Sequence, residues 1–251
     1  MGKSDPIDAL AVARVALREA DLPVARLDGP EREVRLLLEH RDDLVAERTR
    51  AENRLRWYLH ELMPGEAPAL RTLNRQHVLR GLERRLAEVS GTVARLAREL
   101  VLRIGELSRG ITDLERELGQ LVRPLAPTLL DLVGYGVLTA AKLLGETAGI
   151  GRFRSRAAYA RHNGTAPVPV WSGNTERVRL NRGGNRQLNA ALHRIAITQL
   201  QRHGVGLAYV ERRMAAGNTK TEALRALRRR VSDEVYRRLQ LDAQRCGSLL
   251  T

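Results

Sequence analysis

Residues 79–121 read LRGLERRLAEVSGTVARLARELVLRIGELSRGITDLERELGQL, and this stretch decides the fold class. Its apolar side chains recur at alternating intervals of three and four, with one four-residue slip at Arg103. This spacing lines one side of a helix and is typical of a coiled-coil seam with a stutter. The seam positions are Leu79, Leu82, Leu86, Val89, Val93, Leu96, Leu100, Ile104, Leu107, Ile111, Leu114, Leu118 and Leu121. We expect one helix of roughly 60 Å, at about 1.5 Å per residue, ended by Pro124 and Pro127.

A seam of this length needs an apolar partner. Residues 30–62 offer one, because Pro30 suits a first helical turn and apolar residues follow at helical spacing until Pro64 and Gly65. The two segments can form an antiparallel helical hairpin, or the seam can pair with another chain. We expect the hairpin together with a homo-oligomer, a dimer or a tetramer, formed through the coiled coil.

The composition of the 251-residue chain favours helices. Aromatic residues make up only 3% and hydrophobic residues 43%, so Leu, Val, Ala and Ile must build the core. The single cysteine, Cys246, excludes a disulfide framework and suits a reducing cytoplasm. No run approaches the roughly 18 apolar residues that span a bilayer, so we expect a cytoplasmic protein without a membrane partner. The predicted fold is mainly α: a long coiled-coil-like helical hairpin, then a helical C-terminal domain with a helix-hairpin-helix and a short β-hairpin.

Positive charge is concentrated in the C-terminal part of the chain. The formal net charge is +14, yet residues 1–149 hold 23 basic and 23 acidic side chains. Residues 150–251 hold 20 basic and 6 acidic ones and carry the whole excess. A polyanion such as DNA or RNA explains this segregation, because each neutralised phosphate releases counterions. The alternative is an arginine-rich surface that reflects only a GC-rich genome.

Residues 129–144 read LLDLVGYGVLTAAKLL, where Gly134 and Gly136 separate two apolar helical segments. Glycines allow the sharp bend of a helix-hairpin-helix, whose backbone amides bind phosphate without reading sequence. Gly134, Gly136 and Lys142 are therefore candidate nucleic-acid contacts. An ordinary pair of helices joined by a glycine turn explains the same pattern.

Two carboxylates, Asp5 and Asp8, stand three residues apart at the start of a helix predicted over residues 5–20. That spacing lets both face the same way, and paired carboxylates can bind Mg²⁺ together with phosphate oxygens. Acidic residues in a first turn are also favoured simply by capping and by the helix dipole.

A serine at a tight turn is the second candidate for chemistry. Residues 168–171 and 177–180 predict two short strands around Ser172-Gly173-Asn174. A serine exposed on such a turn is a candidate nucleophile toward a phosphodiester, although a turn without chemistry is the alternative. Nearby arginines can bind phosphate bidentately, and Arg177 and Arg179 share a strand face. The candidate phosphate ligands are Arg177, Arg179, Arg182 and Arg186.

A general base for the serine is not identifiable. His162 and His193 are candidates only because they lie near Ser172 in the sequence. The run Arg228-Arg229-Arg230 is expected to be a solvated face or a phosphate contact.

Taken in order, the acidic motif, the long seam and the Ser-Gly motif resemble the insertion-sequence family one-ten of bacterial transposases, from Lys3 to about Leu239. The resemblance implies that Asp5 and Asp8 correspond to the last two acids of an Asp-Glu-Asp-Asp Mg²⁺ site on a RuvC-like domain. It implies that Ser172 is the catalytic serine. It further implies DNA strand exchange through a covalent serine–DNA link, with a structured guide RNA that specifies target and donor.

The family's first Asp and its Glu lie on strands upstream of the matching motif. We therefore expect an N-terminally truncated transposase with an incomplete metal site, in which residues 1–28 are a remnant of the RuvC-like domain. Residues 29–124 should form the long helices, 125–240 the C-terminal transposase domain, and 241–251 a tail without clear structure. The alternatives are a non-catalytic nucleic-acid-binding module or relic, and a structural coiled-coil dimeriser.

Overall fold

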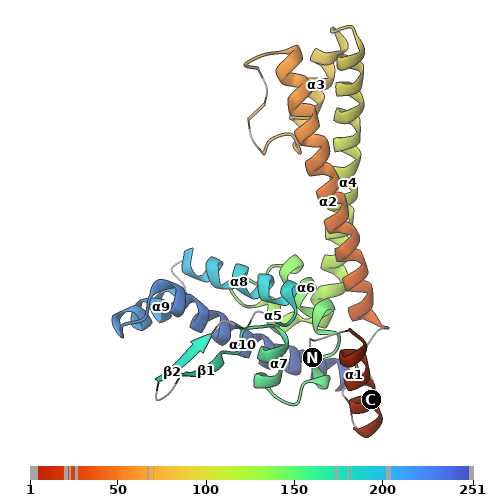
Figure 1. Cartoon of the computed structure of the whole chain (residues 1–251). Coiled ribbons are helices and arrows are strands. Elements are labelled where there is room, and N and C mark those ends of the chain that lie inside the picture. The colour runs from red at the N-terminus through yellow and green to blue at the C-terminus, as the bar shows by residue number, and fades with distance from the viewer. Residues whose placement is uncertain are drawn as a thin grey trace.

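The computed structural model describes residues 5–19, 22, 24–25, 28–66, 68–69, 71–172, 175–179, 181, 183–201 and 205–248. Within these residues it is mainly helical, as predicted, with ten α-helices, one 3-10 helix and two strands. Figure 1 shows a long pair of helices rising from a globular body. We call residues 30–125 the stalk and residues 126–248 the body.

The stalk consists of α2 (Pro30–Leu62), α3 (Gln76–Ala87) and α4 (Thr92–Leu125). α2 and α4 run side by side along its length, and α3 packs on α4 at the end far from the body (Figure 1). Leu55 and Leu59 of α2, Leu86 of α3 and Ile104 of α4 are fully buried in one cluster. The apolar seam therefore finds its partner within the same chain.

The seam is not one continuous helix, and that prediction was wrong. The chain turns at residues 88–91, where Gly91 has a φ of 108° and precedes the first turn of α4. The apolar spacing persists across this turn because Leu86 and Ala97, on either side of it, join the same buried cluster. Hydrophobic periodicity reports burial, whereas only the Ser90-Gly91 pair signals the break.

The body is built around its last helix, α10 (Lys220–Ser248), which contacts most of the other elements. The other helices are α5 (Pro127–Leu130), α6 (Val137–Thr147), α7 (Arg156–His162), α8 (Arg186–Gln201), α9 (Val205–Ala215) and the 3-10 helix η1 (Ile150–Arg152). Their core continues into the base of the stalk through Val34 and Leu38 of α2 and Val122 of α4. Stalk and body are therefore joined by a shared apolar core.

Residues 241–248 are helical where we expected a tail without clear structure, so that prediction was wrong for these residues. α10 continues to Ser248. Asp242, only 1% exposed, accepts a hydrogen bond from the backbone N–H of Thr128 at 3.1 Å, in the first turn of α5. A buried carboxylate at a helix N-terminus is favourable, and it ties this end of α10 to the body.

The first helix, α1 (Asp5–Arg18), has no buried residue in the described structure. Its apolar side chains, among them Leu10, Val12 and Leu17, are exposed. Across the described residues, no helix combines the length and the apolar character needed to cross a membrane.

Candidate functional site

The serine motif lies on a two-stranded hairpin that leaves the body. β1 (Val168–Ser172) pairs antiparallel with β2 (Thr175–Arg179), with Ser172 opposite Thr175 and Val170 opposite Arg177. Ser172 is thus the last residue of β1, and the predicted turn residues Gly173 and Asn174 lie outside the described residues. Figure 1 shows the strands extending outward below α9 and α10. Arg177 and Arg179 lie on β2, and Arg182 lies outside the described residues.

The two ends of this hairpin are joined where they meet the body. The N–H of Asn185 donates to the carbonyl of His162 at 2.6 Å, and the N–H groups of Thr165 and Ala166 both donate to the carbonyl of Ala160. Gly184 has a φ of +87°, and a Cβ there would lie 2.6 Å from the His162 oxygen and 2.8 Å from the Gly164 nitrogen. The backbones cross too closely for a side chain, which explains the glycine.

Three asparagines anchor this crossing, which we call the hairpin base (residues 160–166, 181 and 183–189). Asn163 is fully buried, donates to the hydroxyl of Ser232 at 2.8 Å and accepts from the backbone and hydroxyl of Thr165. Asn189 donates to the carbonyl of Asn163 at 2.9 Å. Asn185 donates to the carboxylate of the buried Glu146 at 2.6 Å. The base is thereby tied to α6, α8 and α10.

The two histidines proposed as bases have different surroundings. His162 is half-buried, its ring lies 5.1 Å from that of Phe153, and its Nε2 lies 3.3 Å from Nη2 of Arg152. Burial, followed by the Arg152 charge, lowers its pKa, although a hydrogen bond to the Glu146 backbone opposes this. The contacts with Arg152 and with the Glu146 backbone occupy the imidazole of His162. The ring therefore packs within the hairpin base. His193 is exposed on α8, and burial and Arg228 lower its pKa, which leaves a neutral imidazole at pH 7.

The glycine turn before α6 faces the body. Gly134 has a φ of +95°, and a Cβ there would lie 3.5 Å from Ile195 and Thr198 of α8. Gly136 is exposed and caps α6, while the helix before the turn, α5, is only four residues long. Lys142 forms an ion pair with Asp42 of the stalk at 3.0 Å. A phosphate at Lys142 would therefore have to compete with Asp42.

Asp5 and Asp8 lie in the first turn of α1, and both are exposed. Among the residues the structure describes, no group of three or more His, Cys, Asp or Glu side chains is placed to hold a metal ion. Two exposed carboxylates on an uncovered helix do not fit a resident metal, because water competes for them and the described residues place no third ligand near them. We therefore derive no chemical step through a metal.

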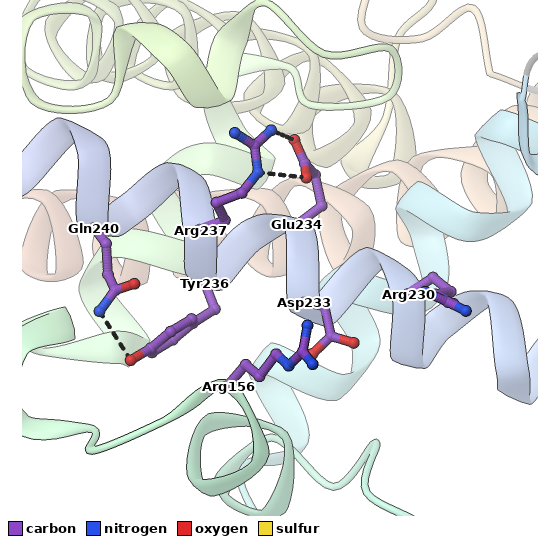
Figure 2. A pocket seen from close by; sticks show the side chains of 7 residues that line it. All are labelled: Arg156, Arg230, Asp233, Glu234, Tyr236, Arg237 and Gln240. Atoms are coloured by element: carbon purple, nitrogen blue, oxygen red, sulfur yellow. Dashed lines mark hydrogen bonds and ion pairs between the residues drawn. The ribbon is translucent and has the colours of Figure 1, made fainter.

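A groove of about 430 Å³ lies between α7 and α10, and Arg156 and Arg237 in its lining were not singled out from the sequence (Figure 2). Asp233 is paired with Arg229, and Glu234 with Arg237 and Arg238, whose hydrogen bonds lower the pKa of Glu234. Arg156 and Arg230 line the same groove and have no carboxylate partner among the described residues. The acids are thus already neutralised, and the groove keeps a positive excess that suits phosphate.

Only the run Arg228-Arg229-Arg230 pointed to this groove in advance, and its members have separate roles. Arg228 donates to Asn189 of the hairpin base, Arg229 pairs with Asp233, and Arg230 faces the groove. Arg186, the first residue of α8, is exposed within the hairpin base.

Two family models match this chain. The transposase family IS116/IS110/IS902 matches residues 126–211, which hold most of the body and the serine hairpin. A DEDD transposase family of the IS110 type matches residues 1–64, which hold α1 and α2.

Three insertion-element proteins are similar over nearly the whole chain. The IS110 protein of Streptomyces coelicolor is 27% identical, over 92% of this chain and 69% of its own length. The IS900 protein of Mycobacterium paratuberculosis is 28% identical, over 91% and 69%. The IS116 protein of Streptomyces clavuligerus is 27% identical, over 95% and 71%.

Matches of this kind, over residues 1–64 and 126–211, identify a transposase of an insertion sequence. The chain belongs to the IS110 family of these transposases. Membership implies a recombinase-type enzyme with DNA as its partner and a dependence on a divalent metal.

Proposed function

We propose that this transposase binds DNA over its basic body and exchanges DNA strands through Ser172. The observation that carries the proposal is the hairpin base, where the buried Asn163, the half-buried Asn189 and a glycine crossing hold the strand that ends in Ser172. A nucleophile must be held within a few tenths of an ångström of its reacting geometry, and rigid anchoring of the flanking chain serves that need.

The proposed step forms a serine–DNA ester. The Ser172 oxygen attacks a DNA phosphorus, its proton passes to a base, and the departing DNA oxygen leaves as a hydroxyl after gaining a proton. The phosphodiester is conserved as an ester of serine, which a hydroxyl of another DNA strand then displaces in the reverse sense. Arg177, Arg179, Arg182 and Arg186 are proposed to bind the non-bridging oxygens, where negative charge grows.

Three partners complete the proposal. A guide RNA would supply sequence recognition, so that the protein reads backbone shape, with Gly134, Gly136 and Lys142 as further contacts. Pairing of stalks between chains would give a homo-oligomer. Mg²⁺ is the metal that the family implies, but Asp5 and Asp8 alone should bind it only weakly, and calorimetric titration against the Asp5→Asn, Asp8→Asn double variant tests this. Equal heats from both proteins would remove these two residues as ligands.

Covalent trapping tests the central step. A labelled duplex of an insertion-element end, nicked on one strand, is incubated with the protein and resolved under denaturing conditions. We expect a protein–DNA adduct with the native chain and none with Ser172→Ala. DNA binding measured without denaturant should be equal for the two proteins, which shows that the variant is folded. Equal adduct formation by both proteins would eliminate Ser172 as the nucleophile.

A further inference from the structure

The stalk carries an exposed tryptophan beside unpaired arginines. Trp57 on α2 is 69% exposed, an unusual state for the largest apolar side chain. Arg50, Asn53 and Arg54 precede it by seven, four and three residues, so all four lie on one face of the helix. Neither Arg50 nor Arg54 has an ion-pair partner among the described residues.

Several other arginines of the stalk have carboxylate partners. Arg48, Arg95, Arg103 and Arg116 all pair with nearby carboxylates. Arg50 and Arg54 instead line a groove of about 640 Å³ between α2 and α4, together with Glu47, Ala51, Asn53, Leu100 and Arg103. The one acid of the groove, Glu47, already accepts hydrogen bonds from Arg103 at 2.9 and 2.7 Å. A local positive excess thus remains in a part of the chain whose total charge is balanced.

We propose that this face of the stalk is a second nucleic-acid site, one that takes a single strand. Arg50 and Arg54 would bind consecutive phosphates, and Trp57 would stack on an unpaired base. A duplex is a poor ligand because its bases are already stacked inside and cannot reach a side chain on a helix surface. A second copy of this chain is disfavoured, because the unpaired guanidinium groups call for an anionic partner. The site does not depend on Ser172 or on the proposed strand exchange.

Tryptophan fluorescence can report strand binding at Trp57 directly, because the chain holds only two tryptophans. In a Trp171→Phe background, Trp57 emission is titrated with a 12-nucleotide thymidine strand, a uridine strand of equal length and a blunt 12-base-pair duplex. We expect quenching by the single strands and little by the duplex, and the comparison of the two strands shows whether DNA or RNA is preferred. Quenching by the duplex alone, or by no probe, would overturn the proposal.

Matched variants separate stacking from charge. Arg50→Gln with Arg54→Gln should lower the salt slope of the quenching titration by about 1.4, at roughly 0.7 for each phosphate contact on a single strand. Arg95→Gln with Arg116→Gln removes the same charge from paired stalk arginines and should leave the slope unchanged. With a fluorescein-labelled strand, Trp57→Ala should weaken binding roughly tenfold and Trp57→Phe should restore most of it.

Two results would refute the site. Equal slopes for both arginine pairs would show that the effect is only net charge. Self-association in sedimentation experiments that Trp57→Ala abolishes, without any change in strand binding, would assign the face to a second copy of the chain. Either result leaves the Ser172 trapping experiment unaffected, because that assay reads the body.

Discussion

Gly184 shows at the scale of one residue how the hairpin base is built. Its φ of +87° is unfavourable for other residues, and the space of a Cβ is already occupied by the backbone of His162 and Gly164. Gly217 has a similar φ of +92° but open space around it. Comparison of Gly184 with Gly217 therefore distinguishes the effect of backbone strain from the effect of a steric clash.

We expect Gly184→Ala to lower the free energy of unfolding by about 3 kcal/mol, as the sum of a left-handed backbone cost and overpacking. Gly217→Ala should lower it by only about 1 kcal/mol. Urea denaturation measures both. Equal losses would mean that the crossing relaxes easily and does not fix the hairpin.

The free energy of unfolding should depend on pH through the single residue His162. Its pKa in the folded protein is lowered, mainly by burial and then by Arg152, from about 6.5 in the unfolded chain. The unfolded chain therefore binds more protons, so the contribution of His162 is present above pH 6.5 and is lost as the pH falls through the lowered pKa.

Stability should accordingly decrease between pH 7 and pH 5, and His162→Gln should make this decrease smaller. Urea midpoints at several pH values measure it. His40→Gln, which removes an exposed imidazole from α2, is the control. A native chain whose stability rises over this range would contradict the assignment.

At the scale of elements, the sequence indicates where helices start, through capping residues, and where they break, but it does not indicate how far a helix continues. Asn185 caps α8 by accepting from the N–H of Leu188 at 2.9 Å, and Thr219 with Glu222 caps α10; both use residue types that favour helix starts. The end of α10 was missed, because its anchor, Asp242, contacts Thr128, a residue 114 positions earlier. Local signals fix where helices start, whereas distant contacts decide how far they continue.

Asn185 both caps α8 and contacts the buried Glu146, and these two contacts predict the loss of stability when Asn185 is replaced. Asn185→Ala leaves the N–H of Leu188 and the buried Glu146 carboxylate without their partner. The expected loss is about 2–3 kcal/mol in the free energy of unfolding. Ser155→Ala, which removes only the exposed cap of α7, should cost about 1 kcal/mol. Thermal or urea unfolding of both variants decides whether the Glu146 contact matters.

At the scale of the whole molecule, the fold brings together charges that the sequence could only count. Arg156 and Arg230 lie 74 positions apart, yet they line one groove. Lys142, predicted as a phosphate contact, forms an ion pair with Asp42, 100 positions earlier. Residue type shows that a side chain can bind an anion, but only the fold shows whether a carboxylate of the chain already occupies it.

The segregation of charge leads to a prediction with a matched control. We expect neutralisation of Arg154, Arg156, Arg186 and Arg194, all exposed on the body, to reduce the salt slope of duplex DNA binding by up to about 3.6. Neutralising Arg80, Arg84, Arg109 and Arg116, exposed on the stalk, lowers the net charge by the same four units and should leave the slope unchanged. Fluorescence anisotropy between about 50 and 200 mM salt measures both slopes. Equal reductions would show that DNA responds to the total charge of the chain rather than to the basic face of its body.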